Sequence, residues 1–133
     1  MNGAMDIVFL TIDEVYRIHE ALMRKDGGRP GVKDRGLIES ALMNVEQTFG
    51  GQYLYANLPE MAGALWFGLV MNHGFIDGNK RVGLACASVF LRKNGHYLNL
   101  SKLEVERITL LIASSQLTRD EVIKIVTANV ARL

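Results

Sequence analysis

The chain has 133 residues, a formal net charge of +1 at pH 7 and a hydrophobic share of 49%. This length is enough for one domain with a modest core, so we expect a single domain over residues 1–133. The near-neutral charge argues against a strongly basic nucleic-acid face, and no apolar stretch approaches the ~20 residues of a membrane span. The first residues do not follow a signal-peptide pattern, so the expected compartment is the cytoplasm.

Helical periodicity and helix-end signals predict three helices in the first half of the chain. Their starts are marked by capping residues or a first-turn proline, namely Thr11 with Glu14, Asp34, and Pro59. The first helix should end at about Lys25, before the pair Gly27-Gly28, and the third should run to His73.

The second half of the chain predicts three more helices and a minor β element. One helix covers residues 82–94 and is apolar nearly all round, like the third, so these two should form a buried central pair around the single cysteine, Cys86. Two capping boxes open the others: Ser101 with Glu104 and Thr118 with Glu121. The last helix should turn inward Val122, Ile125, Val126 and Val130. Residues 7–10 and 97–100 are predicted to pair as a short β-ribbon, so the expected fold is mainly α, a compact bundle around a central helix-loop-helix.

The run His73-Gly74-Phe75-Ile76-Asp77-Gly78-Asn79-Lys80-Arg81 joins the two central helices. Free backbone N–H groups at Gly78 and Asn79, and the positive end of the following helix, make this corner an anion site for which phosphate is the obvious candidate. His73 can accept a proton from a hydroxyl nucleophile. Asp77 supplies an oxygen ligand for magnesium, which typically binds through one or two carboxylates plus substrate phosphates.

The remaining side chains of the run fit the same interpretation. Lys80 and Arg81 would neutralise phosphate charge, and Phe75 would turn inward and anchor the loop. The alternative is structural: a histidine at a helix end, an Asx-turn at Asp77-Gly78 and a solvated basic turn. We favour the functional interpretation because nine residues carry the whole set.

Three other features have plainer explanations. Residues 27–31 lack the Gly-Lys-Ser/Thr ending of a P-loop, so they should form a helix cap and turn, with Arg29 a candidate for substrate contact. His19 and His96 have no partner at metal-ligand spacing and are predicted to be surface or cap histidines. The long connection at residues 47–57 is either ordinary packing or a flap that positions a substrate segment.

The motif and several other segments resemble the Fic/Doc superfamily, specifically its short Doc (death-on-curing) toxin branch. The other segments are Phe9-Leu10-Thr11, residues 30–42, and Phe49-Gly50-Gly51 with Leu54-Tyr55. The resemblance implies a Fic/Doc-like helical bundle that uses ATP and Mg²⁺, and it favours the flap. It assigns catalysis to His73, Asp77, Lys80 and Arg81, nucleotide binding to Gly78, Asn79, Lys80 and Arg81, the metal to Asp77, and a structural role to Phe75.

Departures within the motif bear on the reaction. Fic proteins that transfer AMP resemble His-Pro-Phe-x-Asp/Glu-Gly-Asn-Gly-Arg-x-x-Arg, whereas this chain has Lys80 for the second Gly and Leu84 for the last Arg. In the Doc branch the lysine goes with ATP bound in the opposite sense, which implies transfer of the gamma-phosphoryl to translation elongation factor Tu and a halt in protein synthesis. Gly74 replaces the usual Pro and should loosen the loop.

The resemblance also implies a partner. The chain has no Ser/Thr-x-x-x-Glu-Gly/Asn run of the kind that inhibits many Fic proteins from within. A Phd-type antitoxin, whose C-terminal segment folds into a helix along a groove on the toxin, is therefore expected. Two alternatives stay open: an AMP transferase, which Gly78 favours, and a weakly active or inactive protein that acts mainly as an antitoxin-binding co-repressor, which Gly74 favours.

Overall fold

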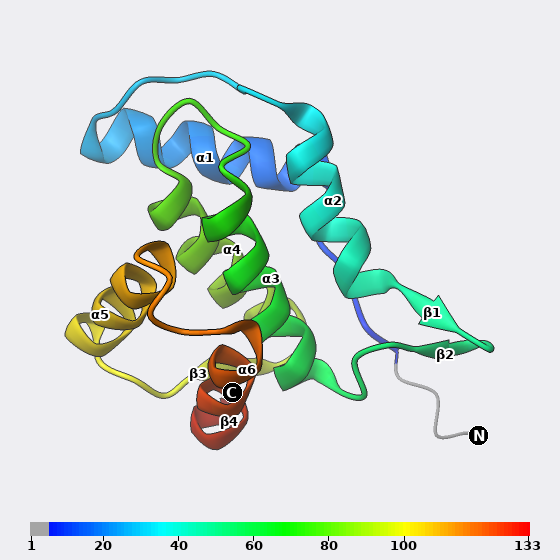
Figure 1. Cartoon of the computed structure of the whole chain (residues 1–133). Helices are drawn as coiled ribbons and strands as arrows, with labels where there is room; N and C mark the ends of the chain where they lie inside the picture. Colours follow the sequence, from blue (N-terminus) through cyan, green and yellow to red (C-terminus); the bar gives the residue numbers. More distant parts are fainter. Residues whose placement is uncertain (1–5) are drawn as a thin grey trace.

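A computed structural model describes residues 6–133 (Figure 1), so the predicted domain start at residue 1 lies outside the described range. The elements in chain order are α1 (Ile12–Asp26), α2 (Arg35–Glu46), β1 (Thr48–Phe49), β2 (Gln52–Tyr53), α3 (Leu58–Asn72), α4 (Asn79–Lys93), β3 (His96–Leu98), α5 (Lys102–Ala113), α6 (Arg119–Asn129) and β4 (Val130–Arg132). The predicted mainly α fold is confirmed. None of the helices in the described range is long and apolar enough to cross a lipid bilayer.

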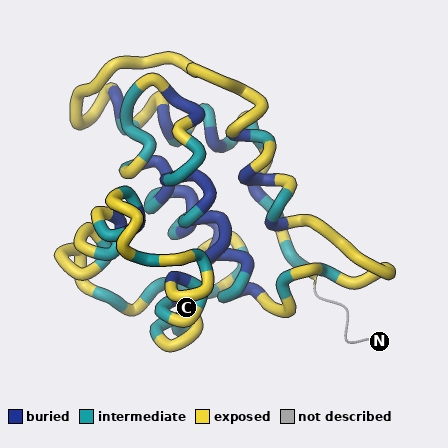
Figure 2. Tube along the Cα trace, in the orientation of Figure 1, coloured by how far each residue is buried: buried dark blue, intermediate teal, exposed yellow. Residues whose placement is uncertain are grey.

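The centre of the bundle is the pair α3 and α4, as the sequence predicted (Figure 2). The two helices approach closely because α4 has a glycine at the contact: a Cβ on Gly83 would lie 2.5 Å from Val70 Cγ2. Trp66 is fully buried in α3, and its indole N–H donates to Thr109 of α5 at 3.1 Å. Cys86 is also fully buried, and desolvation raises the pKa of its thiol to about 12, so it is a packing residue.

The helix starts follow the sequence signals. All three predicted capping boxes form, at Thr11, Ser101 and Thr118, each with the glutamate three residues on. Pro59 lies in the first turn of α3, where its missing N–H leaves no helical hydrogen bond unmade. Local chemistry therefore fixes most of the helix starts.

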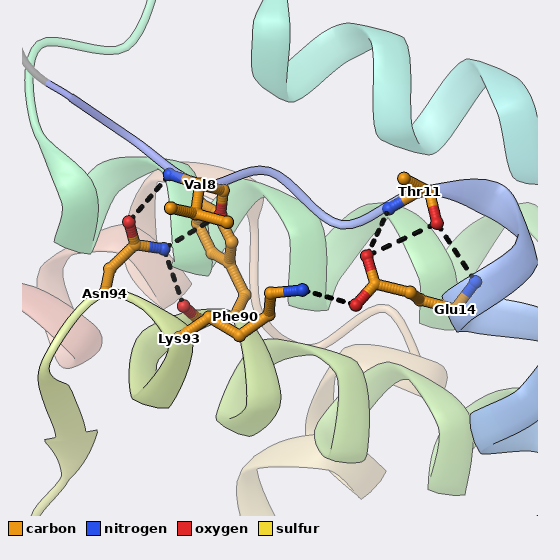
Figure 3. A network of polar contacts seen from close by, with 6 residues as sticks. All are labelled: Val8, Thr11, Glu14, Phe90, Lys93 and Asn94. Atoms are coloured by element: carbon orange, nitrogen blue, oxygen red, sulfur yellow. Dashed lines mark hydrogen bonds and ion pairs between the residues drawn. The ribbon is translucent and has the colours of Figure 1, made fainter.

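The predicted β-ribbon is wrong. β3 pairs with the C-terminal strand β4 in antiparallel register, His96 opposite Arg132 and Leu98 opposite Val130, so α6 ends at Asn129 and Val130 belongs to a strand. The N-terminal segment instead runs along the end of α4 (Figure 3). There the Asn94 side chain accepts from Val8 N–H at 2.8 Å and donates to the Val8 carbonyl at 2.9 Å. An amide side chain thus takes both main-chain bonds that a neighbouring strand would have made.

Two connections position the corner between α3 and α4. We call residues 73–78 the motif loop and residues 27–34 the α1–α2 loop. In Figure 1 the α1–α2 loop passes over the motif loop at the top of the molecule. At the other end of α2, β1 and β2 form a hairpin, so the predicted long connection is a projecting hairpin on which Phe49 is 87% exposed.

Candidate active site

The motif loop begins with a sharp turn at His73. This residue is the C-cap of α3 and has left-handed backbone angles, φ 52° and ψ 47°, which are uncommon for a residue other than glycine. The turn ends the helix and leaves the imidazole exposed. An open cavity of about 540 Å³ lies beside it, lined by His73, Ile76, Asp77, Gly78, Asn79, Lys80, Arg81 and Ala113. The structure therefore brings the sequence-predicted residues onto one cavity, with Phe75 beneath.

Main-chain pairing with the α1–α2 loop holds the motif loop in place. The Gly74 carbonyl accepts the N–H groups of Lys33 and Asp34 at 2.9 and 3.0 Å, and Ile76 N–H donates to the Gly31 carbonyl at 3.1 Å. From the inside, Phe75 is 2% exposed, as predicted. The Asn79 side chain brackets Phe75, accepting from its N–H and donating to its carbonyl, both at 3.0 Å. The Asn79 side chain thus stabilises the loop, and its amide oxygen and nitrogen are both used in these two hydrogen bonds.

Gly74 does not loosen the loop, contrary to the sequence prediction. The residue is buried, and a Cβ at this position would lie 2.4 Å from Ile38 Cγ1 and 3.3 Å from the Asp34 carbonyl oxygen. The side chain of Ile38, on α2, fills the space that a larger residue would need. Glycine here permits the close contact between α2 and the motif loop, so its presence is no sign of a degraded site.

A double-mutant cycle tests this contact. We expect Gly74→Ala to destabilise the fold by about 1–3 kcal/mol, because it overpacks a buried contact. In the double variant Gly74→Ala with Ile38→Ala, the loss of unfolding free energy should be clearly smaller than the sum of the two single losses. The reason is that the methyl group added at position 74 fills part of the space that Ile38→Ala leaves empty. Urea unfolding measures all three variants, and additive losses would show that the two residues are not coupled.

The carboxylate of Asp77 accepts hydrogen bonds from two backbone amides. Its Oδ2 accepts the N–H of Arg29 at 3.0 Å, and its Oδ1 accepts the N–H of Gly78 at 2.8 Å. These bonds, first that from Arg29 and then that from Gly78, lower the pKa of Asp77, and the charges of Arg81 and Arg29 lower it further. The carboxylate is therefore ionised at neutral pH, and Arg29 contributes its main chain to the site.

The start of α4 lines the side of the cavity at which the sequence predicts an anion site. Gly78 is the N-cap with φ 81° and offers no side-chain cap, while its own N–H is taken by Asp77. The first helical bond is that of Val82 N–H to the Gly78 carbonyl at 2.9 Å, so the N–H groups of Asn79, Lys80 and Arg81 precede it. The amides available to an anion thus start at Asn79, one residue later than predicted.

The two cations of the motif are placed differently. Lys80 is exposed at the rim of the cavity. Arg81 is half-buried: Nη1 donates to the Gly27 carbonyl at 2.8 Å, and Nη2 lies 3.8 Å from Met23 Sδ. Arg81 therefore ties the start of α4 to the end of α1 while its charge stays beside Asp77.

The prediction that His19 is a surface histidine is wrong. The side chain is 4% exposed and stacks on Phe75, with ring centroids 3.9 Å apart and planes at 11°. Its Nε2 lies 2.8 Å from the Asp77 carbonyl oxygen. The sequence did contain a signal, because Val15, His19 and Met23 recur every fourth residue and form the buried face of α1. His96 is the first residue of β3, opposite Arg132, and its Nδ1 lies 2.7 Å from the Asn94 carbonyl oxygen just beyond α4.

The donor set limits how a metal ion could be held. Within residues 6–133, no three His, Cys, Asp or Glu side chains lie together in a metal-ligating group. Asp77 faces the cavity as a single ionised carboxylate, and each of its oxygens keeps a lone pair beyond the one used by an amide. This set fits Mg²⁺, which keeps waters and substrate phosphate oxygens as its other ligands, better than a cation that needs an all-protein cage.

The sequence of this chain is similar to one known protein family and to two named proteins. Residues 9–91 match the family described as the Fic/DOC family, a range that runs from the segment before α1 almost to the end of α4. The chain is 41% identical over 69 residues to a protein named Toxin Doc from Mycolicibacterium smegmatis, covering 52% of this chain and 53% of that protein. It is 31% identical over 83 residues to Protein kinase doc of Escherichia phage P1, covering 62% and 65%.

The family match spans α1 to α4, a stretch that carries every residue lining the cavity except Ala113 of α5. The matched region covers less than two thirds of the length of either relative. Both relatives carry Doc names, which agrees with the lysine at position 80 of the motif. The chain therefore belongs to the Fic/DOC family, in its Doc branch.

Proposed function

We propose that this protein is the toxin of a toxin–antitoxin pair and transfers the gamma-phosphoryl group of ATP to a hydroxyl of translation elongation factor Tu. The observation that carries the proposal is the shared cavity, onto which His73, Asp77 and the exposed Lys80 all open at the start of α4. The relatives named as a toxin and as a protein kinase support it. Elongation factor Tu is cytoplasmic, so action in the cytoplasm is part of the proposal.

Different groups of the chain would transfer the proton, bind the phosphate and bind the metal ion. His73, exposed at the cavity edge, takes the proton of the acceptor hydroxyl as the oxygen attacks the gamma-phosphorus. The bond between that phosphorus and the bridging oxygen of ATP breaks, and ADP leaves. The amides at the start of α4 and the ammonium of Lys80 would hold the phosphate oxygens, and Asp77 would hold Mg²⁺. When bound, Mg²⁺ would neutralise the charge that builds on the phosphate oxygens.

AMP transfer is the less favoured reaction. The resemblance places an arginine that grips the distal phosphates of ATP at position 84 in AMP-transferring Fic proteins. In this chain Leu84 lines an apolar groove between α4 and α5. The position offers no donor to phosphate, while Lys80 adds a cation at the cavity. Both differences favour phosphoryl transfer.

The α4–α5 groove is the proposed seat of a Phd-type antitoxin helix. It has a volume of about 570 Å³ and is lined by Lys80, Arg81, Leu84, Leu103, Glu106, Arg107, Thr109 and Leu110. Leu103 and Leu110, seven residues apart on α5, are 77% and 57% exposed, a spacing that suits the apolar stripe of a helix. Lys80 and Arg81 line both the groove and the cavity beside His73, so a helix bound in the groove would lie next to that cavity.

Substitution of the exposed leucines tests the groove. We expect Leu103→Glu with Leu110→Glu to weaken binding of the neighbouring gene's antitoxin by about 30-fold or more, because each change loses buried apolar area and places a carboxylate in the interface. Toxicity without antitoxin should persist. Leu133→Glu, at another exposed leucine, is the matched control. Unchanged neutralisation by the antitoxin in the double variant would place its binding site elsewhere.

Expression in a bacterium tests the toxin proposal itself. Induction of this protein should stop incorporation of labelled amino acids before that of labelled uridine, because the proposed target acts in translation. Co-expression of the antitoxin should restore growth. Normal amino-acid incorporation at a confirmed level of folded protein would contradict the toxin function, and it would favour the alternative of an antitoxin-binding co-repressor.

A further inference from the structure

The buried face of α1 packs against the motif loop. His19 is 4% exposed and lies flat against Phe75, whose ring is itself 2% exposed. A Cβ placed on Gly78 would lie 2.4 Å from Met23 Cε and 3.5 Å from His19 Nε2. The peptide that follows Asp77 therefore rests directly on α1, with no space between them for a side chain.

One hydrogen bond joins His19 to this peptide. Nε2 lies 2.8 Å from the Asp77 carbonyl oxygen. A carbonyl oxygen can only accept, so Nε2 carries the proton and donates. The stack on Phe75 fixes the plane of the imidazole, and this fixes the direction in which the N–H points. His19 is thus a rigid donor aimed at the main chain of the motif.

The peptide unit carries this restraint to the carboxylate. In a planar trans peptide the carbonyl and the N–H point in opposite directions, so holding the Asp77 carbonyl also sets the direction of the Gly78 N–H. That N–H donates to Asp77 Oδ1 at 2.8 Å. The sequence of contacts runs from the His19 imidazole through one peptide plane to the carboxylate that opens onto the cavity.

We propose that His19 is a positioning residue that orients the Asp77 carboxylate for its metal ion by fixing the Asp77–Gly78 peptide plane. This inference rests on the proposed role of Asp77 as a magnesium ligand. The Arg29 N–H holds the second carboxylate oxygen from the α1–α2 loop, so the carboxylate is oriented from two independent sides. Partners that orient a metal ligand typically affect metal affinity by about 10–100-fold when they are removed.

Three variants separate the hydrogen bond from general stability. His19→Phe keeps an aromatic ring to stack on Phe75 and removes the donor. His19→Gln keeps an N–H donor near the place of Nε2 and removes the ring. His96→Phe is the matched control, because it removes another histidine contact to a backbone carbonyl, at 2.7 Å, beyond the opposite end of α4. The 15 residues of α4 keep the two places about 22 Å apart.

The measurements use the protein without substrate. Amide hydrogen exchange, followed by NMR, reports the bonds made by Gly78 and Arg29, and added Mn²⁺ broadens the signals of amides near a bound cation. In His19→Phe we expect faster exchange at these two amides relative to the rest of α3 and α4, and a half-saturating Mn²⁺ concentration raised by about tenfold or more. His19→Gln should recover most of this loss, and His96→Phe should match the wild type.

The contrary outcomes are distinct. Unchanged Gly78 exchange and Mn²⁺ response in His19→Phe would overturn the inference, as would an equal rise in exchange at all amides, which would indicate a purely structural role. No Mn²⁺ effect around residue 77 in the wild type would overturn both the metal role of Asp77 and this inference. The expected Mn²⁺ pattern together with no phosphorylation of elongation factor Tu would sustain the inference and defeat the proposed function.

Discussion

Replacement of His73 is expected to lower the rate of phosphoryl transfer by about 10²–10⁴-fold, because the acceptor hydroxyl loses its general base. His73→Asn is the sharper variant. Asparagine tolerates the left-handed backbone angles found at this position better than alanine does, so the turn that ends α3 should be kept. Single-turnover transfer rates to elongation factor Tu measure the loss, and growth arrest should disappear in parallel.

Asp77→Ala should abolish toxicity for a different reason, since it removes the one carboxylate of the motif that faces the cavity. Both amides that now bind the carboxylate, those of Arg29 and Gly78, would then face water or a bound anion. Circular dichroism and thermal unfolding provide the check that both variants are folded. Full growth arrest by either variant at wild-type expression would show that the assigned role of that residue is wrong.

Lys80→Gly is expected to reduce phosphorylation sharply, because the site loses a cation beside the transferred group. The change also restores the Gly-Asn-Gly sequence that the resemblance associates with AMP transfer. Lys80 is exposed, so the fold should tolerate its loss, and Lys102→Gly, which alters another exposed lysine in the first turn of a helix, is the matched control. Initial rates with ATP labelled at the gamma or the alpha phosphorus distinguish the two reactions.

A fair test of a switch in chemistry needs a second change. Leu84→Arg, added to Lys80→Gly, would supply the guanidinium that the resemblance assigns to the distal phosphates in AMP-transferring Fic proteins. Leu84 is only partly buried and lines an open groove, so a long side chain has a route to water. Undiminished gamma-phosphoryl transfer in the single variant would show that Lys80 is a solvated helix-start residue, and the preference for phosphoryl transfer would lose its main support.

Features set by local chemistry were predictable from the sequence. The capping boxes at Thr11, Ser101 and Thr118 form because each glutamate lies three residues after its hydroxyl partner, whatever surrounds them. The cavity residues of the motif come together for a similar reason, since nine consecutive residues between two helices cannot lie far apart. Contacts between distant segments were harder to predict. The pairing of β3 with the C-terminus depends on which segment reaches that edge, and period-two alternation cannot decide this.

The residues that pack against the motif loop also differ in how far the sequence predicted them. The inward direction of Phe75 follows from its size and its neighbours. The burial of His19 was missed because its polarity was given more weight than its place on the Val15–Met23 face of α1. Gly74 was misinterpreted because the fit of Ile38 against it is visible only once α2 is in place. For Gly74 the missing information lay in a second helix packed on the loop, whereas for His19 the spacing within α1 already contained it.

The most direct measurement is the intact mass of elongation factor Tu after incubation with this protein, ATP and Mg²⁺, with His73→Asn as the inactive control. Our account predicts a gain of one phosphoryl group with the wild type and no gain with the control. A gain of one AMP group would contradict phosphoryl transfer and establish the alternative chemistry. An unchanged mass with folded, Mn²⁺-responsive protein would contradict the proposed substrate.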